Sequence, residues 1–273
     1  MSQPHAGVVQ MNDEDVKAGQ AKPSIARTYS YLLGDRDYYA VDQEIGQYFM
    51  DALPGSVRIA TTARRAVERA VREIARDGVG QFIDFGCGLP TVDNVHQIAQ
   101  RELPDARVVY VDNDPIVVAH GRARMATDGQ TIVILADARD PASIYDNADA
   151  RSLLDFDQPV GLLFSAVLGF VNDDEDPYGI VRFWVERIAS GSRVYIAHFR
   201  SGYNEETVAT EQKLQGTWGR GRWRGDSEIT KLFAGLDILP PGLVPCAQWR
   251  PESGPREITS WEQLIVSGLA AKP

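Results

Sequence analysis

The stretch Phe82-Ile83-Asp84-Phe85-Gly86-Cys87-Gly88 decides how this 273-residue chain should fold. An apolar strand runs into a Gly-x-Gly turn, and residues 92–102 continue with helical periodicity. Glycine allows the backbone to turn tightly and to approach a ligand without an intervening Cβ atom. The stretch predicts a strand, a turn and a helix with a ligand at Gly86, Cys87 and Gly88, although a βα turn without a ligand has the same pattern.

Strands and helices alternate through the rest of the chain. Predicted strands cover residues 81–85, 107–111, 131–135, 160–165 and 192–198, with predicted helices between them. This alternation is typical of βαβ units in a parallel, doubly wound sheet. Residues 236–249 and 260–268 predict two more strands without a crossover helix, which favours an antiparallel hairpin at the sheet edge. We expect an α/β fold with a Rossmann-like sheet of about seven strands.

The chain divides into three predicted parts. Residues 1–22 are polar and without periodicity, which predicts a disordered tail. Residues 23–78 contain three predicted helices that form a helical cap. Residues 79–273 form the ligand-binding domain, with an insertion near 202–225 on the substrate side.

Acidic residues lie at the ends of the first two predicted strands, where open α/β sheets bind ligands. Asp84 suits a ligand that carries an ammonium group. Asp112, followed by Asn113, can accept hydrogen bonds from both ribose hydroxyls of an adenosine ligand. Asp114 precedes Pro115 and fits a helix N-cap better. S-adenosylmethionine (SAM) has both an adenosine and an ammonium group.

The third and fourth strand ends extend this pattern. Asp137 with Ala138 can meet the adenine amino group, or it can be a loop or cap residue. Ser165 leaves the fourth strand among small residues that would let a cofactor and a substrate meet. The dinucleotide-binding motif contains a third glycine at the position where this chain has Thr91, which disfavours a dinucleotide site. No tyrosine has a lysine four residues later, which also disfavours an NAD(P) oxidoreductase of the short-chain type.

Composition excludes several classes of protein. The formal net charge of −10 argues against a protein that clamps a nucleic acid backbone. The longest apolar run, residues 159–171, is shorter than the roughly 20 residues of a membrane helix. Two distant cysteines and a polar N-terminus without signal-peptide features indicate a reducing compartment. We expect a cytoplasmic protein without a metal, since its four histidines lack ligand spacing.

The order of these motifs resembles that of class I SAM methyltransferases. More narrowly, the chain resembles an actinobacterial family of SAM methyltransferase-like proteins formerly known as a domain of unknown function. Its matching strings are Pro23-Ser24-Ile25-Ala26-Arg27, Tyr31-Leu32-Leu33-Gly34, Asp37, Gly88-Leu89-Pro90-Thr91, Asn94-Val95-His96, residues 109–115, Ala166-Val167-Leu168, Val244-Pro245 and Trp249-Arg250-Pro251. The resemblance implies the class I fold and SAM binding at Gly86, Gly88, Asp112 and Asp137. Relatives usually have His where this chain has Gly169, and a second glycine where it has Asp35.

Few residues are candidates for catalysis. His198 ends the fifth strand and is a candidate base, or a histidine bonded to backbone. Arg27, Tyr29 and Asp37 lie in the N-terminal segment, which often forms a lid over the cofactor in such folds. Arg27 is a candidate partner for the SAM carboxylate, or it forms a surface ion pair. We keep Asp37 as a second catalytic candidate.

Residues 218–224 combine two tryptophans and three arginines, which would bind an acidic or flat substrate or form a mobile loop. We predict a SAM-dependent methyltransferase that acts on a small molecule, with a role in specialised metabolism suggested by the resemblance. Two alternatives stay open: a SAM enzyme that cyclises or rearranges its substrate, and a SAM-binding protein without catalysis.

Overall fold

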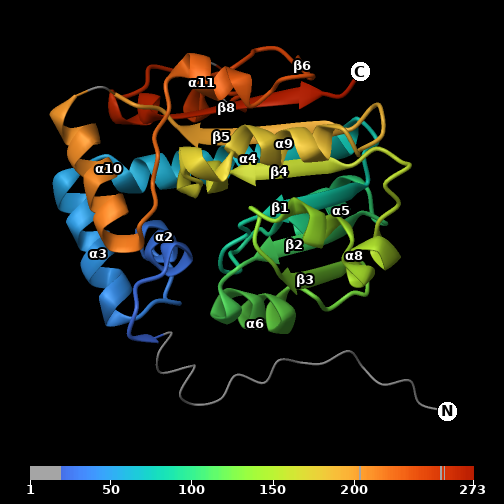
Figure 1. The fold of residues 1–273 in the computed structure, drawn as a ribbon, viewed down its shortest axis with the longest axis horizontal. Coiled ribbons are helices and arrows are strands. Elements are labelled where there is room, and N and C mark those ends of the chain that lie inside the picture. The colour runs from blue at the N-terminus through green and yellow to red at the C-terminus, as the bar shows by residue number, and fades with distance from the viewer. Residues whose placement is uncertain (1–19, 203, 253, 255) are drawn as a thin grey trace.

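The computed structural model describes residues 20–202, 204–252, 254 and 256–273, and its centre is one mixed sheet. The strand order is β3-β2-β1-β4-β5-β8-β6, and β7 pairs with β8 (Figure 1). The first five strands pair in parallel: β1 (Gln81–Phe85), β2 (Arg107–Asp112), β3 (Thr131–Leu135), β4 (Gly161–Ser165) and β5 (Arg193–Phe199). The order reverses between β1 and β4, which is where open α/β sheets bind ligands. The predicted α/β class and parallel sheet are confirmed.

The carboxyl-terminal edge of the sheet is antiparallel, as predicted. β8 (Ile265–Ala271) runs antiparallel to β5, to β6 (Asp237–Ile238) and to β7 (Val244–Pro245). The continuous strand predicted over 236–249 is wrong, because Pro240 and Pro241 lack the N–H groups that a central strand donates. Two strands of two residues each replace it, so the described sheet has eight strands rather than about seven.

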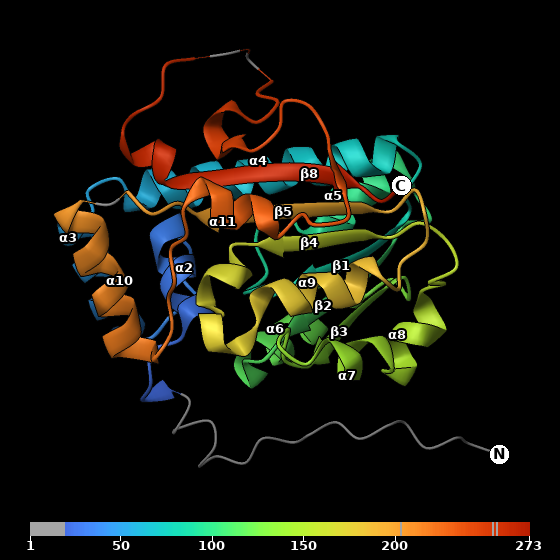
Figure 2. The same ribbon diagram turned by 45° about the horizontal axis from the view of Figure 1, so that its top comes forward.

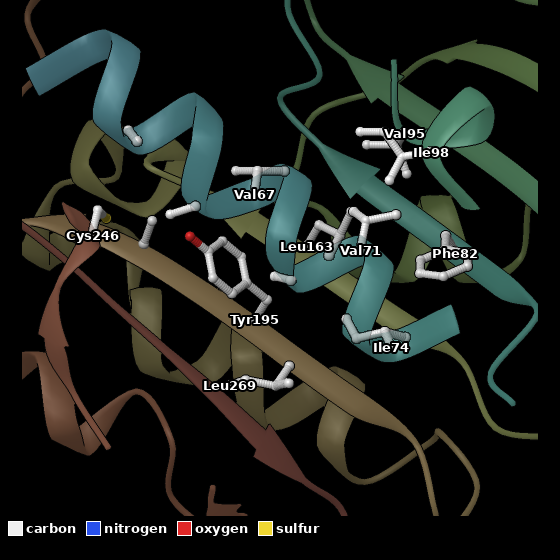
Figure 3. Packing of buried hydrophobic residues seen from close by; sticks show 14 of the residues in the cluster. Val67, Val71, Ile74, Phe82, Val95, Ile98, Leu163, Tyr195, Cys246 and Leu269 are labelled. Carbon is white, nitrogen blue, oxygen red and sulfur yellow. The ribbon is translucent and has the colours of Figure 1, made fainter. Parts of the chain in front are cut away.

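Helices cover both faces of the sheet. One core lies under α4 (Ser56–Arg76), α5 (Val95–Glu102) and α6 (Pro115–Arg124), and the other under α7 (Pro141–Tyr145), α8 (Ala148–Leu153) and α9 (Pro177–Val185). β1 serves both cores, because Phe82 packs into the first and Ile83 and Phe85 into the second. Figure 3 shows Val67 and Val71, one helical turn apart on α4, directed at the sheet.

Three helices lie together at the carboxyl ends of the parallel strands (Figures 1 and 2). They are α2 (Ile25–Leu33), α3 (Ala40–Ala52) and α10 (Glu205–Trp218). α10 ends at Gly219, whose φ of 66° is left-handed. α11 (Asp226–Lys231) leads back to the sheet.

Two predictions concern the rest of the chain. The predicted disordered tail falls outside the described residues except for residues 20–22. Within the described ranges, no helix is both long enough and apolar enough to cross a membrane.

Candidate functional site

A cavity of about 600 Å³ lies between the ends of the parallel strands and the three helices above them. Its volume is in the range of sites that hold a small molecule or a cofactor. The cavity brings together every residue predicted to bind the cofactor: Arg27, Tyr29, Asp84, Gly86, Cys87, Gly88, Asp112, Asn113, Asp137, Ala138 and Ser165. Their individual roles stay predictions, but the fold does place them at one site.

The Gly-x-Gly turn has the backbone conformation that requires glycine. Gly86 has a φ of 65° and Gly88 a φ of 67°, both left-handed. A Cβ atom on Gly86 would lie 2.7 Å from Cγ2 of Val167, whereas one on Gly88 would meet no atom within 4 Å. Gly86 is therefore needed for packing, and Gly88 leaves open space in the cavity wall where a ligand can approach the backbone.

Asp84 is a buried carboxylate at the cavity wall, and only 5% of its surface is exposed. Among the described residues it has no hydrogen-bond or ion-pair partner; the nearby Arg64 bonds instead to Oγ1 of Thr91 at 2.7 Å. Burial raises the pKa of Asp84 to about 7, against a smaller lowering by the charge of Arg64. Because an unpaired buried carboxylate is costly, this position fits a cationic group such as the SAM ammonium.

Asp112 is held by the backbone around it. Oδ2 accepts the N–H of Gly88 at 3.0 Å, and Oδ1 accepts the N–H of Asp114 at 2.9 Å. Burial raises the pKa of Asp112 to about 6, although these bonds partly oppose the rise. Each oxygen keeps a lone pair, so the carboxylate has capacity for two hydroxyl donors. Asp114 caps α6 by accepting the N–H of Ile116 at 2.9 Å, which confirms its predicted role.

Asp137 is oriented by an arginine that sequence reasoning missed. Arg139 donates from its backbone N–H (2.9 Å) and from Nε (2.8 Å) to Oδ1, and Asn113 donates to Oδ2 at 3.3 Å. Burial would raise the pKa of Asp137, but the bonds from Arg139 prevail and hold it at about 2. The ionised carboxylate is a strong acceptor for an amino group such as that of adenine. The i,i+2 spacing of Asp137 and Arg139 was the available sequence signal.

Arg27 and Tyr29 line the cavity but have protein partners. Arg27 is buried rather than at the surface; its Nε lies 2.7 Å from Oδ2 of Asp42, and its Nη1 lies 3.5 Å from Oδ2 of Asp114. The Tyr29 hydroxyl donates to the carbonyl of Ala60 at 3.0 Å, and burial raises its pKa to about 12. These contacts fix α2 over the cavity.

The two residues predicted to act in catalysis lie elsewhere. His198 is fully buried and is not a lining residue; Nδ1 donates to the Phe199 carbonyl at 2.8 Å, and Nε2 accepts from Arg224 at 3.0 Å. Burial lowers the pKa of His198 to about 4. Asp37 is half-exposed and pairs with Arg124 at 2.7 Å. We therefore correct both assignments: both nitrogens of His198 have partners, which leaves none to act as a base, and Asp37 pairs with Arg124 and does not line the cavity.

The aromatic and basic stretch 218–224 is divided by the structure. Trp218, Arg220 and Trp223 line the cavity, whereas Arg222 and Arg224 pair with Asp173 outside it. Further aromatic lining residues were missed because nothing in the sequence separates them from core residues; they are Phe49, Phe170 and Phe199.

Comparisons with known proteins agree with this geometry. The model of a family described as S-adenosyl methyltransferase matches residues 11–273. A crystal structure from Thermobifida fusca, with a provisional methyltransferase description, is 35% identical with a TM-score of 0.89, covering 92% of this chain and 96% of that one. A DUF574 family protein from Streptomyces avermitilis is 34% identical with a TM-score of 0.88, covering 93% of this chain and 99% of that one. No curated protein gives a significant match.

These findings confirm the predicted resemblance, the class I fold, and SAM as the cofactor of a methyltransferase. The residues of the cavity fit that cofactor. Asp84 has no partner among the described residues, Asp112 and Asp137 are oriented carboxylates with acceptor capacity, and open space lies beside Gly88. The chain belongs to the S-adenosyl methyltransferase family.

Proposed function

We propose that this enzyme methylates a small molecule that binds beside SAM in the same cavity. One observation carries the proposal: the predicted cofactor residues and a separate, largely apolar wall line one continuous cavity of about 600 Å³. When bound, SAM supplies an electrophilic methyl group, which an acceptor lone pair attacks while the sulfur keeps the electrons of the broken bond.

Each cofactor residue has a distinct part in this proposal. The Asp84 carboxylate would pair with the ammonium group, Asp112 would accept from the ribose hydroxyls, and Asp137 would accept from the adenine amino group. Gly88 would leave room for the ligand against the backbone. Charge-assisted hydrogen bonds of this kind are about twice as strong as neutral ones, so they would dominate cofactor affinity.

The chain's own contribution to the reaction would be positioning and exclusion of water. Among the described residues, no histidine lines the cavity, and the lining Tyr29 already donates its hydroxyl to Ala60. Holding two reactants in line can supply much of a rate enhancement without a base. This arrangement favours an acceptor atom that is nucleophilic before it binds.

The first test is calorimetric titration with SAM and S-adenosylhomocysteine (SAH). We expect micromolar binding of both, weakened roughly 10- to 100-fold in Asp112→Ala, since a hydrogen bond to a charged group is worth about 1.5–3 kcal/mol. Asp157→Ala, an exposed carboxylate outside the cavity, is the matched control. Absence of binding by folded protein would refute the proposal.

An acceptor screen follows, with product mass as the readout. A methylated product supports the proposal. SAM consumed without a methylated product would favour cyclisation or rearrangement, and SAM that stays intact throughout would favour a binding protein.

Location and partners belong to the same proposal. The chain carries a formal net charge of −10, and Cys87 and Cys246 are both free thiols. These features support a cytoplasmic enzyme whose acceptor is a small molecule rather than a nucleic acid.

A further inference from the structure

The cavity has a second half, which lies over β5 and β8 and is separate from the cofactor residues of β1–β3. Five aromatic side chains from four segments line it: Phe49, Phe170, Phe199, Trp218 and Trp223. We call this half the aromatic chamber. Phe170 belongs to the short helix η1 (Val167–Phe170), which follows β4.

The aromatic rings of the chamber are ordered against one another. Phe49 and Trp218 stack with centroids 6.1 Å apart, and Phe170 meets Trp218 edge to face at 6.5 Å. Phe199 and Trp223 stack at 5.1 Å with an interplanar angle of 8°. Such pairs are favourable ring geometries, and they present fixed ring surfaces to a ligand.

Trp218 is fixed by a hydrogen bond as well as by packing. Its Nε1–H donates to the carbonyl of Pro23 at 2.9 Å, which ties the end of α10 to the residue before α2. A side chain held in this way loses little conformational freedom when a ligand binds, so the chamber is preorganised.

The arginine beside the aromatic chamber is paired. Arg220 is the charged lining residue on this side, and its Nη1 binds both carboxylate oxygens of Glu175, at 2.6 Å and 2.8 Å. Lys22, which precedes α2, also lines the cavity, but it is exposed rather than buried. The remaining charged lining residues belong to α2, α4 and the ends of β1–β3, at the cofactor half. A charged acceptor in the chamber would be buried without a partner, which is unfavourable.

We infer that the methyl acceptor is an uncharged, largely apolar molecule with an aromatic ring, which packs against Phe49 and Trp218. This inference rests on the proposed function, because it names the substrate class of the same cavity. Aromatic rings gain contact with the fixed rings of the chamber, and a neutral acceptor has no charge to desolvate.

A matched pair of fluorescent probes tests the chemistry of the chamber. N-phenyl-1-naphthylamine is neutral, and 8-anilinonaphthalene-1-sulfonate has the same ring system with one negative charge. We expect the neutral probe to bind the full chain at least 10-fold more tightly, and saturating SAH not to displace it. Equal or tighter binding of the sulfonate, or displacement of the neutral probe by SAH, would overturn the inference.

Variants locate the probe. Trp218→Leu and Phe49→Leu should each weaken the neutral probe at least 5-fold while SAH affinity stays within 2-fold of wild type. Tyr48→Leu is the control, because Tyr48 precedes Phe49 on α3 but is 38% exposed and outside the cavity lining. If Phe49→Leu fails to fold by circular dichroism, Trp218→Leu decides alone. Wild-type probe affinity in the folded variants would refute the inference. Failure of SAH to bind would instead refute the proposed function. The comparison of the two probes does not need SAH, and the displacement test is read only where SAH binds.

Discussion

Replacing Asp84 by asparagine should stabilise the ligand-free protein, and the gain should grow with pH. Asp84 is 5% exposed, and burial raises the pKa of its carboxyl group from the ordinary 3.8 to about 7. Below pH 4 the group is protonated in both the folded and the unfolded chain, so ionisation contributes nothing. Between pH 4 and pH 7 only the unfolded chain loses the proton, and the free energy of unfolding falls as pH rises.

The size of the stability gain follows from the pKa shift of Asp84. A difference of about three pKa units corresponds to about 4 kcal/mol above pH 7, at 1.36 kcal/mol per unit. Asparagine cannot ionise, so the stability difference between Asp84→Asn and wild type should grow by about 3 kcal/mol from pH 5 to pH 8. Asp112 is present in both proteins, so the comparison reports Asp84 together with its charge interaction with Asp112.

Urea unfolding followed by circular dichroism at pH 5, 6, 7 and 8 measures this difference. Asp157→Asn, at an exposed position, should show no such pH-dependent gain. A stability difference for Asp84→Asn that does not change with pH would refute the reasoning, because it would mean that the carboxylate is already ionised in the folded protein. A loss of stability at every pH would mean that Asp84 has a stabilising partner.

Three further predictions concern the cofactor half of the cavity. At pH 6, where Asp84 is mostly protonated in the free protein, SAH binding should release a proton. Calorimetry in two buffers of different ionisation enthalpy measures this proton release. Binding heats that do not depend on the buffer would contradict the prediction. Gly88→Ala should lower the free energy of unfolding by about 1–2 kcal/mol, because its φ is left-handed, and should weaken SAH affinity at least 10-fold. Gly86→Ala should be less stable still, because its Cβ meets Val167. Urea unfolding and SAH titration check both variants, and equal stability of the two would contradict the packing argument. Arg139→Ala should raise the pKa of Asp137 from about 2 toward its ordinary range and weaken SAH affinity about 3- to 10-fold, since it removes charge-assisted bonds that orient the carboxylate. NMR titration of Asp137 and calorimetry measure these two effects. An unchanged pKa would assign the shift to other groups.

Much of the fold could be predicted because its signals are local. The apolar run before Gly86, the aspartate that ends β2 and the aspartate that follows β3 are visible in single short strings. Residues that share the carboxyl edge of a parallel sheet meet whatever the length of the chain between them. The residues that line this half of the cavity could therefore be grouped from sequence alone, while their roles toward the cofactor stay predictions.

The aromatic chamber could not be predicted, because it depends on tertiary packing. Phe49 and Trp218 come from helices far apart in the chain, and an apolar residue lining a cavity has the same sequence pattern as one in a core. The prediction that His198 is a catalytic base was wrong for a related reason. Side chains of a strand alternate between its two faces, and position at a strand end does not tell whether a side chain points into the site or into the core.

The placement of the tryptophans gives the protein its own optical reporter. Trp184 and Trp249 are fully buried in the two cores and do not line the cavity. Trp218 is partly buried and lines the aromatic chamber, which Trp223 also lines although it is only 2% exposed. Indole emission depends on the polarity and contacts of the ring, so a molecule that enters the chamber and contacts Trp218 changes its emission. Trp184, Trp249 and Trp261 do not line the cavity and contribute a constant background. A compound library can thus be screened against the unlabelled enzyme by its intrinsic spectrum, before anything is known of which atom receives the methyl group.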